Sequence, residues 1–416
     1  MNKFNYNKTL TFYGYSNVKV VKLLGSFYFC NKLFLLFLEE KDNLLFNSLF
    51  VIKDGKIIDY ICNFIDQQFN FESSSIMDGS FFSKNLKPYL FYTGSIMDEN
   101  GNFKSVIVRS DFSPINNLIS HKTELRVDFN NVKKYNRNIS NPFVFSYNNR
   151  YYLLVVSNNL ETNNATLLLF SLSDFLNNPR FIKEINIKDI YETIDSIHLK
   201  VMGDSILLFI TSTFKNKSTK DPLNGQISFY SIIEDLHNFF NDKDEIYFIT
   251  NFNKVDVSDN FIYPLIYSIN NVNYLLGVVS DSVNNNLITS PKVFSFDGNK
   301  IKLTLNEVSK KLISKIFDNR VLFRELYLED DHKIELLDDQ KLLFTISYDG
   351  FDLKIENHTT LKIDESYILV NKDKCNVKVL VDTNVLEIYI DNFCVYTAII
   401  HIEKKILMHK NFIVKI

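Results

Sequence analysis

The feature that most constrains the fold of this chain is a succession of short apolar runs. Each is rich in Phe, Tyr, Ile, Val and Leu and is broken off by Asn, Asp, Ser, Gly or Lys. Examples are Leu33–Leu38, Leu44–Ile52, Tyr151–Val156, Ala165–Leu172 and Leu386–Ile390. The runs recur at roughly ten-residue spacing, which is typical of all-β sandwiches, barrels and propellers. The pattern therefore predicts an all-β protein.

Helical patterning is scarce. Val308–Phe317 places its apolar residues on one face, so a short amphipathic helix is expected there, and Ile232–Phe240 could form another helical turn. Neither resembles the crossover helix of a βαβ unit, so a doubly wound fold is not expected. With only 11 glycines in the chain, Asn is expected to fill turn positions, because Asn also enters the left-handed region.

Composition and charge exclude several classes of function. The formal net charge is -3, which gives no electrostatic case for binding nucleic acid or an anionic membrane surface. The four cysteines have no CxxC spacing and no nearby histidine, so neither a zinc site nor any other cofactor is expected. The first residues lack a charged start followed by an apolar run, so no secretory signal is expected. We therefore predict a cytoplasmic protein with reduced thiols.

Five segments carry motifs that can be compared with known families. They are YLFYTGSIMDENGNFKSVIVRS (Tyr89–Ser110), SNPFVFSYNNRYYLLVVS (Ser140–Ser157), TIDSIHLKVMGDSILLFI (Thr193–Ile210), NFIYPLIYSINNVNYLLG (Asn260–Gly277) and VKVLVDTNVLEIYIDNFCVYTAII (Val377–Ile400). In this order they resemble the motifs of glycoside hydrolase family 32, which includes invertases, sucrose-6-phosphate hydrolases and other β-fructofuranosidases. The first and the last of them are the most specific.

The resemblance implies a fold and a division into domains. A five-bladed β-propeller would cover about residues 1–303, and a C-terminal β-sandwich would cover about residues 304–416. The short helix would lie at about residues 306–317, in the link between them. The groups of strands before this link are blade-like in length, and longer alternating strands follow it, as expected of a sandwich.

The resemblance also implies a retaining glycosidase mechanism. It needs a carboxylate nucleophile and a carboxylic acid about 5 Å apart. In this family a third carboxylate stabilises the positively charged transition state. Aligning Gly25–Phe37 with the strand after the nucleophile motif places Lys22 at the nucleophile position. The RDP motif becomes Ser140-Asn141-Pro142, and the ECP motif becomes Asp195-Ser196-Ile197.

One of the three carboxylates thus survives, as Asp195, which is one methylene shorter than the family's Glu. Lys22 cannot perform the displacement in the usual way, and Asn141 carries no charge to stabilise a cation. The family's FSGS strand appears as Met77–Ser80, so Asp78 and Ser80 are expected to line the mouth of the pocket. His198, which follows Asp195, is expected to be a surface or packing residue.

Three hypotheses follow. The first is a family member that has lost hydrolysis. It would bind a sugar, or a sugar phosphate for which Lys22 would suit the anionic group, or it would act as a partner subunit. The second is an active glycosidase on sucrose or a sucrose phosphate that uses Asp78 and Asp195. The third is an unrelated propeller that binds other proteins, or a chain that is decaying under weak selection. The sequence names neither a ligand nor an oligomeric state.

Overall fold

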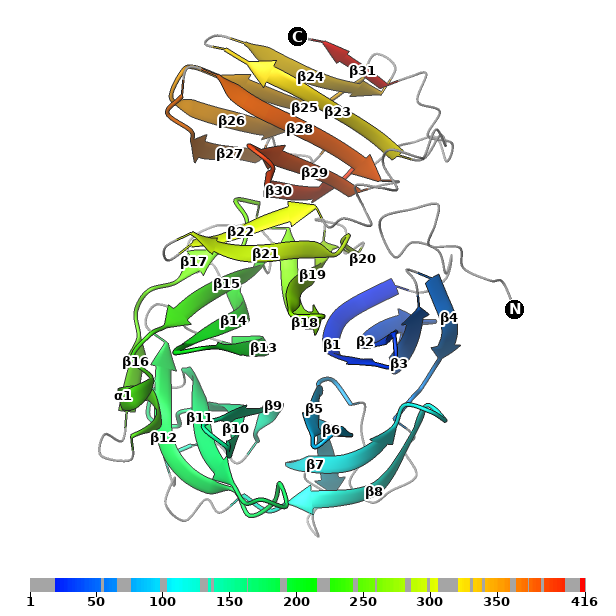
Figure 1. The fold of residues 1–416 in the computed structure, drawn as a ribbon, viewed down its shortest axis with the longest axis vertical. Helices are drawn as coiled ribbons and strands as arrows, with labels where there is room; N and C mark the ends of the chain where they lie inside the picture. The colour runs from blue at the N-terminus through cyan, green and yellow to red at the C-terminus, as the bar shows by residue number, and fades with distance from the viewer. Residues whose placement is uncertain are drawn as a thin grey trace. The chain divides into compact units, whose positions relative to one another are not determined.

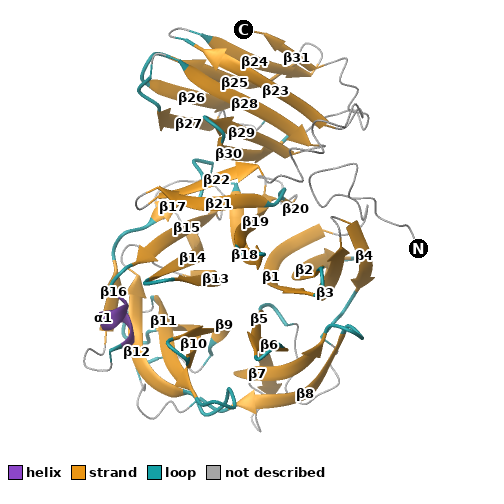
Figure 2. Cartoon of the chain, viewed as in Figure 1, coloured by secondary structure: helices purple, strands orange, loops and turns teal. Residues whose placement is uncertain are grey.

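The computed structural model of the chain consists almost entirely of β-strands (Figure 2). It describes residues 19–53, 56–65, 76–97, 103–127, 134–135, 138–162, 164–187, 193–214, 225–241, 246–258, 260–280, 286–297, 300–305, 321–329, 332–338, 341–359, 364–372, 374–382, 385–400 and 412–415. The chain forms two compact units, an N-terminal unit of residues 17–254 with 263–267 and a C-terminal unit that includes residues 255–262 and 268–416. The prediction of an all-β protein is confirmed.

Four sheets make up the N-terminal unit (Figure 1). The first holds β1 (Lys19–Phe29), β2 (Lys32–Lys41), β3 (Leu44–Lys53) and β4 (Lys56–Ile61). The second holds β5 (Ser80–Lys84), β6 (Lys87–Met97), β7 (Phe103–Ser113) and β8 (Leu118–Leu125). The third holds β9 (Ser140–Tyr147), β10 (Arg150–Asn158), β11 (Ala165–Leu172) and β12 (Arg180–Ile187), with β16 (Ile246–Ile249) added parallel to β12. The fourth holds β13 (Thr193–Met202), β14 (Ser205–Phe214), β15 (Gly225–Ile233) and β17 (Asn253–Lys254).

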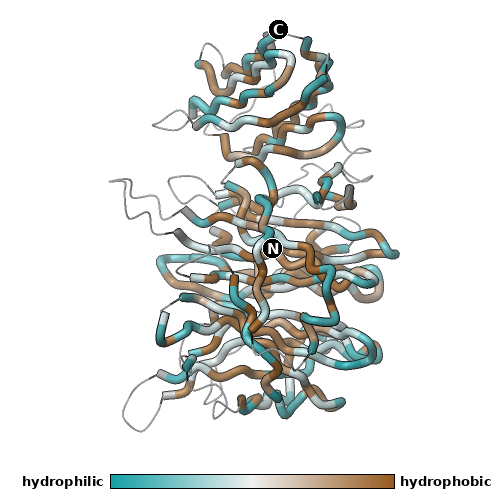
Figure 3. The backbone as a smooth tube through the Cα atoms, turned by 90° about the vertical axis from the view of Figure 1, so that its left-hand side faces the viewer, coloured by the Kyte–Doolittle hydropathy of each residue, from teal (hydrophilic) through white to brown (hydrophobic). Residues whose placement is uncertain are grey.

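Successive sheets of this unit pack face to face. One hydrophobic cluster joins the first sheet to the second, another the second to the third, and another the third to the fourth. Strands such as β2 and β11 are therefore buried along nearly their whole length, which explains why their sequences are continuous apolar runs without alternation. Figure 3 shows apolar residues along the strands and hydrophilic residues at many of the turns.

The first strands of the four sheets lie next to one another. β5 contacts both β1 and β9, and β9 in turn contacts β13 (Figure 1). Side chains that leave these strands on the shared side therefore converge. Asn fills many of the turns between the strands, as expected: Asn31, Asn85, Asn148 and Asn271 have positive φ angles of 48–64°.

The C-terminal unit contains three sheets. The first consists of β18 (Phe261–Ile269), β19 (Val272–Ser280), β20 (Asn286–Ile288), β21 (Lys292–Asp297) and β22 (Lys300–Leu305), although residues 263–267 of β18 cluster with the N-terminal unit. The second has the order β23 (Val321–Leu328), β28 (Cys375–Asp382), β29 (Val385–Ile390) and β30 (Phe393–Ile399). The third has the order β27 (Asp364–Leu369), β26 (Asp352–Asn357), β25 (Lys341–Tyr348), β24 (Lys333–Asp338) and β31 (Phe412–Lys415). The last two sheets share one hydrophobic core.

Several smaller expectations can be compared with this fold. A helix, α1 (Leu236–Phe240), lies within the segment where a helical turn was expected, whereas the helix expected at about residues 306–317 falls outside the described residues. All four cysteines, Cys30, Cys62, Cys375 and Cys394, are free thiols. Among the helices in the described part of the chain, none is long and apolar enough to cross a membrane.

Candidate functional site

Three of the predicted site residues lie at irregularities of the first strands. In β1 the pairing register shifts on both sides of Lys22 and Leu23. In β9 it shifts between the residues that flank Asn141 and Pro142, and in β13 it shifts at Asp195. A bulge bends a strand and redirects its side chains. The same device thus recurs in three sheets, and it brings Lys22, Asn141 and Asp195 together.

The Lys22 side chain is buried, with 9% of the residue exposed, and its nitrogen donates three hydrogen bonds. The acceptors are the backbone oxygen of Met77 at 3.3 Å, Oδ1 of Asn141 at 3.0 Å and the backbone oxygen of Asp195. The Tyr263 ring lies beyond them, with its centroid 5.9 Å from the nitrogen. Burial lowers the pKa of Lys22 from its ordinary value, and the negative charges of Asp78 and Asp195 oppose that shift.

Asn141 is held in a strained backbone conformation. Its φ angle is +52°, and Pro142 follows it, which disfavours helical angles at the preceding residue. Its backbone N–H donates to Oδ2 of Asp78 at 2.6 Å. The same carboxylate accepts two bonds from Thr93, one from the backbone N–H and one from the hydroxyl, both at 2.8 Å. Asp78 therefore fixes the position of Asn141. Asp78 itself is buried, with 4% of the residue exposed.

Asp78 and Ser80, which were predicted to line the mouth of the pocket, are held inside the structure by hydrogen bonds. Both residues are buried, and the Ser80 hydroxyl donates to the backbone oxygen of Pro142 at 2.7 Å. They support the Asn141–Pro142 turn and do not present free polar groups to solvent. The reason is local: Asp78 faces three donors, so its carboxylate is drawn inward against β6 and β9.

Asp195 is partly exposed and is the most accessible carboxylate of this group. Its oxygens accept hydrogen bonds from the hydroxyls of Thr193, at 3.3 Å, and Thr213, and from the side-chain amide of Gln226 at 3.4 Å. The backbone of Tyr263 is anchored nearby, because its N–H donates to the Thr211 hydroxyl at 3.1 Å. Burial, followed by the Asp195 charge, raises the pKa of the Tyr263 hydroxyl, so Tyr263 is neutral.

A small cavity lies among these residues and is lined in part by Lys22, Asp78, Asn141, Ser196 and His198. His198 is 4% exposed and meets the Phe143 ring edge to face. Burial, and to a lesser degree the nearby charge of Lys22, lowers the pKa of His198 to about 3, so the imidazole is neutral. His198 is thus a packing residue, one of the two roles expected for it, but it packs against the cavity.

The structure brings the predicted residues together, but it surrounds them with side chains that the sequence analysis did not name. Lys22, Asn141 and Asp195 do converge, with Asp78 behind Asn141. Sequence reasoning missed the contributions of Thr93, Thr213, Gln226 and Tyr263. Thr93 belongs to the YLFYTG motif and Tyr263 to the NFIYPLIYS segment, so the motifs that carry the resemblance were the available signal. Among the described residues, no group of three His, Cys, Asp or Glu side chains could hold a metal ion.

The arrangement has limited chemical capacity. The Lys22 nitrogen donates to three protein oxygens, and Asn141 is neutral. Of the two carboxylates, Asp78 already accepts three hydrogen bonds and only Asp195 is partly exposed. The site can therefore offer one carboxyl group to a ligand, together with the polar groups that surround Asp195.

Comparison with known proteins identifies the family. The model for the glycosyl hydrolases family 32 N-terminal domain matches residues 63–287. No curated protein matches the sequence. Among solved structures, sucrose-6-phosphate hydrolase from Lactobacillus gasseri is similar, with a TM-score of 0.72, 15% identity, and coverage of 96% of this chain and 90% of that one. A Bombyx mori family 32 beta-fructofuranosidase has a TM-score of 0.67, 14% identity, and coverage of 99% and 91%.

An exo-inulinase from Aspergillus awamori is also similar, with a TM-score of 0.61, 13% identity, and coverage of 97% of this chain and 95% of that one. At these identities the structural likeness concerns the fold. The family model, in contrast, spans more than half of the sequence, including the YLFYTG motif and the segments around Asn141, Asp195 and Tyr263. The chain therefore belongs to glycosyl hydrolase family 32.

Proposed function

We propose that the chain is a catalytically impaired member of the β-fructofuranosidase and sucrose-6-phosphate hydrolase type. The observation that carries the proposal is the position of the Lys22 nitrogen. The sequence alignment assigns Lys22 to the position of the nucleophilic carboxylate, and its nitrogen donates to three protein oxygens. The fixed ammonium group makes this a site that cannot form a glycosyl–enzyme ester.

The proposed fold is a five-bladed β-propeller over about residues 1–303 followed by a β-sandwich over about residues 304–416. Five four- or five-stranded sheets succeed one another along the first part of the chain, and this order supports the propeller. The shared core of the last two sheets supports the sandwich.

The electrostatics of the site support loss of hydrolysis. Cleavage of a fructoside passes through a transition state with positive charge on the sugar. A lysine ammonium near that charge raises its energy, whereas a carboxylate would lower it. Asn141, at the third carboxylate position, contributes no compensating charge. Asp195 alone could protonate a leaving group, but a general acid without a nucleophile contributes only part of the rate enhancement.

The test is an assay for fructose release from sucrose, sucrose 6-phosphate and inulin. We expect release to stay at the uncatalysed background for all three substrates. Saturable release that Asp195→Asn abolishes, and that the exposed-surface control Asp204→Asn leaves intact, would contradict the proposal. That outcome would favour an active glycosidase that uses Asp195 with Asp78, even though Asp78 is buried and already accepts three hydrogen bonds.

A second candidate, a non-catalytic sugar-binding protein, is favoured by one observation. Asp195 is partly exposed among Thr193, Thr213 and Gln226, a set of groups that suits sugar hydroxyls. Lys22 offers little to a phosphate, because its three donors are engaged. Calorimetry should therefore detect fructose or sucrose no more weakly than fructose 6-phosphate, and Asp195→Ala should abolish that heat. The absence of heat with every sugar would remove this candidate and leave the first intact.

A further inference from the structure

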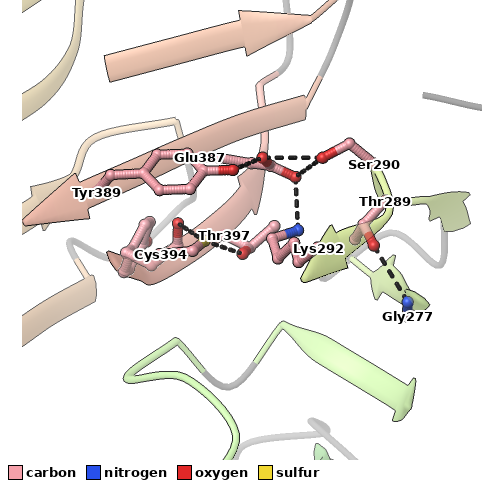
Figure 4. A network of polar contacts seen from close by, with 9 residues as sticks. Gly277, Thr289, Ser290, Lys292, Glu387, Tyr389, Cys394 and Thr397 are labelled. Carbon is pink, nitrogen blue, oxygen red and sulfur yellow. Dashed lines mark hydrogen bonds and ion pairs between the residues drawn. The ribbon is translucent and has the colours of Figure 1, made fainter. Parts of the chain in front are cut away.

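A buried group of ionisable residues lies in the C-terminal unit. Lys292, at the start of β21, and Glu387, in β29, form an ion pair of 2.7 Å, with side chains 0% and 2% exposed (Figure 4). Glu387 also accepts hydrogen bonds from the hydroxyls of Ser290, at 3.0 and 3.1 Å, and Tyr389. Both carboxylate oxygens of Glu387 therefore already have hydrogen-bond donors.

Asp256 is a second buried carboxyl group near this pair. It precedes β18, 7% of the residue is exposed, and its Oδ1 accepts from the Ser258 hydroxyl at 2.8 Å. Its Oδ2 is buried and has no hydrogen-bond partner among the described residues. A buried oxygen without a partner is tolerated far better on a neutral carboxyl group than on an ionised one.

The neighbouring groups supply no second positive charge. The titratable side chains that face this region are Lys292 from β21, Glu387 and Tyr389 from β29, and Cys394 from β30. Burial raises the pKa of the Cys394 thiol to about 12, and burial also raises the pKa of Tyr389. Both are therefore neutral, and the single cation, Lys292, is already paired with Glu387. An ionised Asp256 would leave this group of described residues with two carboxylates for one ammonium.

The segment that carries Asp256 is attached to the neighbouring sheet by its backbone. The N–H of Val257 donates to the backbone oxygen of Val395, in β30, at 2.9 Å. The backbone oxygen of Val257 accepts from the Ser366 hydroxyl, in β27, at 3.4 Å. Any change that disfavours the buried position of Asp256 therefore acts directly on the hydrogen bond between Val257 and β30.

We propose that Asp256 is a pH-sensitive latch, which holds residues 255–258 against β30 most firmly when its carboxyl group is protonated and loosens as that group ionises. Burial is the main cause of a pKa of about 7 for Asp256. The Ser258 hydroxyl and Lys292 oppose it, and so does the Thr397 hydroxyl, which lies near the carboxyl group without meeting hydrogen-bond geometry to Oδ2. In the open form the carboxyl group meets water and titrates near the ordinary value of 3.8. The form in which residues 255–258 have left β30 therefore becomes more stable, relative to the closed form, as the pH rises from about 4 to about 7. Above about pH 7 its relative stability no longer changes.

The measurement is amide hydrogen exchange at Val257 in the full-length protein, corrected for the intrinsic exchange rate. Between about pH 5 and pH 7 the opening constant should rise by roughly 10- to 50-fold, from the two pKa values of Asp256. Asp256→Asn cannot ionise, so its opening constant should stay constant across this range. The matched control Glu335→Gln, which removes a partly exposed carboxylate of the same unit, should retain the rise.

Ser258→Ala gives a second test that does not depend on how well Asp256→Asn folds. Its hydroxyl bond to Oδ1 favours the ionised carboxylate, so its loss should extend the rise in opening to higher pH. A pH-dependent opening that persists unchanged in Asp256→Asn would overturn the proposal. The proposal would also be overturned if the wild-type opening constant at Val257 were the same at pH 5 and pH 7. The same holds if Ser258→Ala left the pH range of the rise in the opening constant unchanged.

Discussion

Each compact unit buries at least one lysine, and two of these lysines, Lys22 and Lys292, are held in opposite ways. Lys292 in the C-terminal unit pairs with the Glu387 carboxylate at 2.7 Å. Lys22 in the N-terminal unit forms no ion pair with any described carboxylate and donates instead to two backbone oxygens and one amide oxygen. Burial acts to lower the pKa of both, but only at Lys292 do nearby negative groups, Glu387 first, outweigh it and raise the pKa.

The different acceptors of Lys22 and Lys292 indicate two ways in which a protein can accommodate a buried charge. Lys292 and Glu387 depend on each other, because either charge alone would be buried without an opposite charge to compensate it. Lys22 is a single charge at a position where the family resemblance places a carboxylate, and neutral oxygens accommodate it. A lysine that is held only by neutral oxygens should be easier to replace than a member of an ion pair. The predictions below test that ranking.

The largest effect is expected for Lys292→Met. It leaves Glu387 buried without its cation, which destabilises a protein by about 3–5 kcal/mol. The double variant Lys292→Met/Glu387→Gln should recover more than half of that loss, because the amide can still accept from Ser290. Urea unfolding of both variants measures the two free energies. If the double variant were no more stable than Lys292→Met, the pair would not be the source of the loss.

A smaller loss is expected for Lys22→Met, which removes three hydrogen bonds and a buried charge together. Losing the donors leaves three oxygens unsatisfied, while losing the charge relieves its desolvation, so the net destabilisation should be about 1–2 kcal/mol. The same urea experiment measures it. A loss as large as that of Lys292→Met would mean that Lys22 is as strongly coupled to its surroundings as the ion pair, and would end the contrast.

The sequence predicted one of these regions and not the other. Asn141 and Asp195 could be found because the segments around them resemble motifs of the family, whereas Lys22 was found only by aligning the strand that follows it. These three residues converge because the strands that carry them have bulges. No local pattern in NVKVVKLLG or SNPF predicts a bulge. Lys292 and Glu387 lie 95 residues apart in ordinary strand sequences. Their pairing depends on which strands meet in space, and apolar periodicity predicts that a strand exists without predicting its distant neighbours.

The smallest effect concerns His198, which shares the cavity with Lys22. Its pKa of about 3 in the folded protein lies below the ordinary 6.5, so folding keeps the imidazole neutral. Its contribution to stability is therefore complete above pH 6.5 and is lost as the pH falls from 6.5 toward 3. Between pH 7 and pH 5.5 the loss should be about 1 kcal/mol. Urea unfolding at the two pH values measures the loss as the difference between the wild type and His198→Gln, because ionisation of Asp256 changes the stability of both proteins equally and in the opposite direction. The exposed control His237→Gln should behave as the wild type does.

The same histidine reports on the charge state of Lys22. Burial is the larger cause of the low pKa of His198, and the positive charge of Lys22 is the smaller one. Removing that charge in Lys22→Met should therefore raise the pKa of His198 only part of the way toward 6.5, as followed by an NMR titration of the imidazole. An unchanged titration would mean that Lys22 is neutral in the folded protein, with burial prevailing over Asp78 and Asp195. In that case Lys22 and Lys292 would differ in their protonation state as well as in the groups that accept their hydrogen bonds.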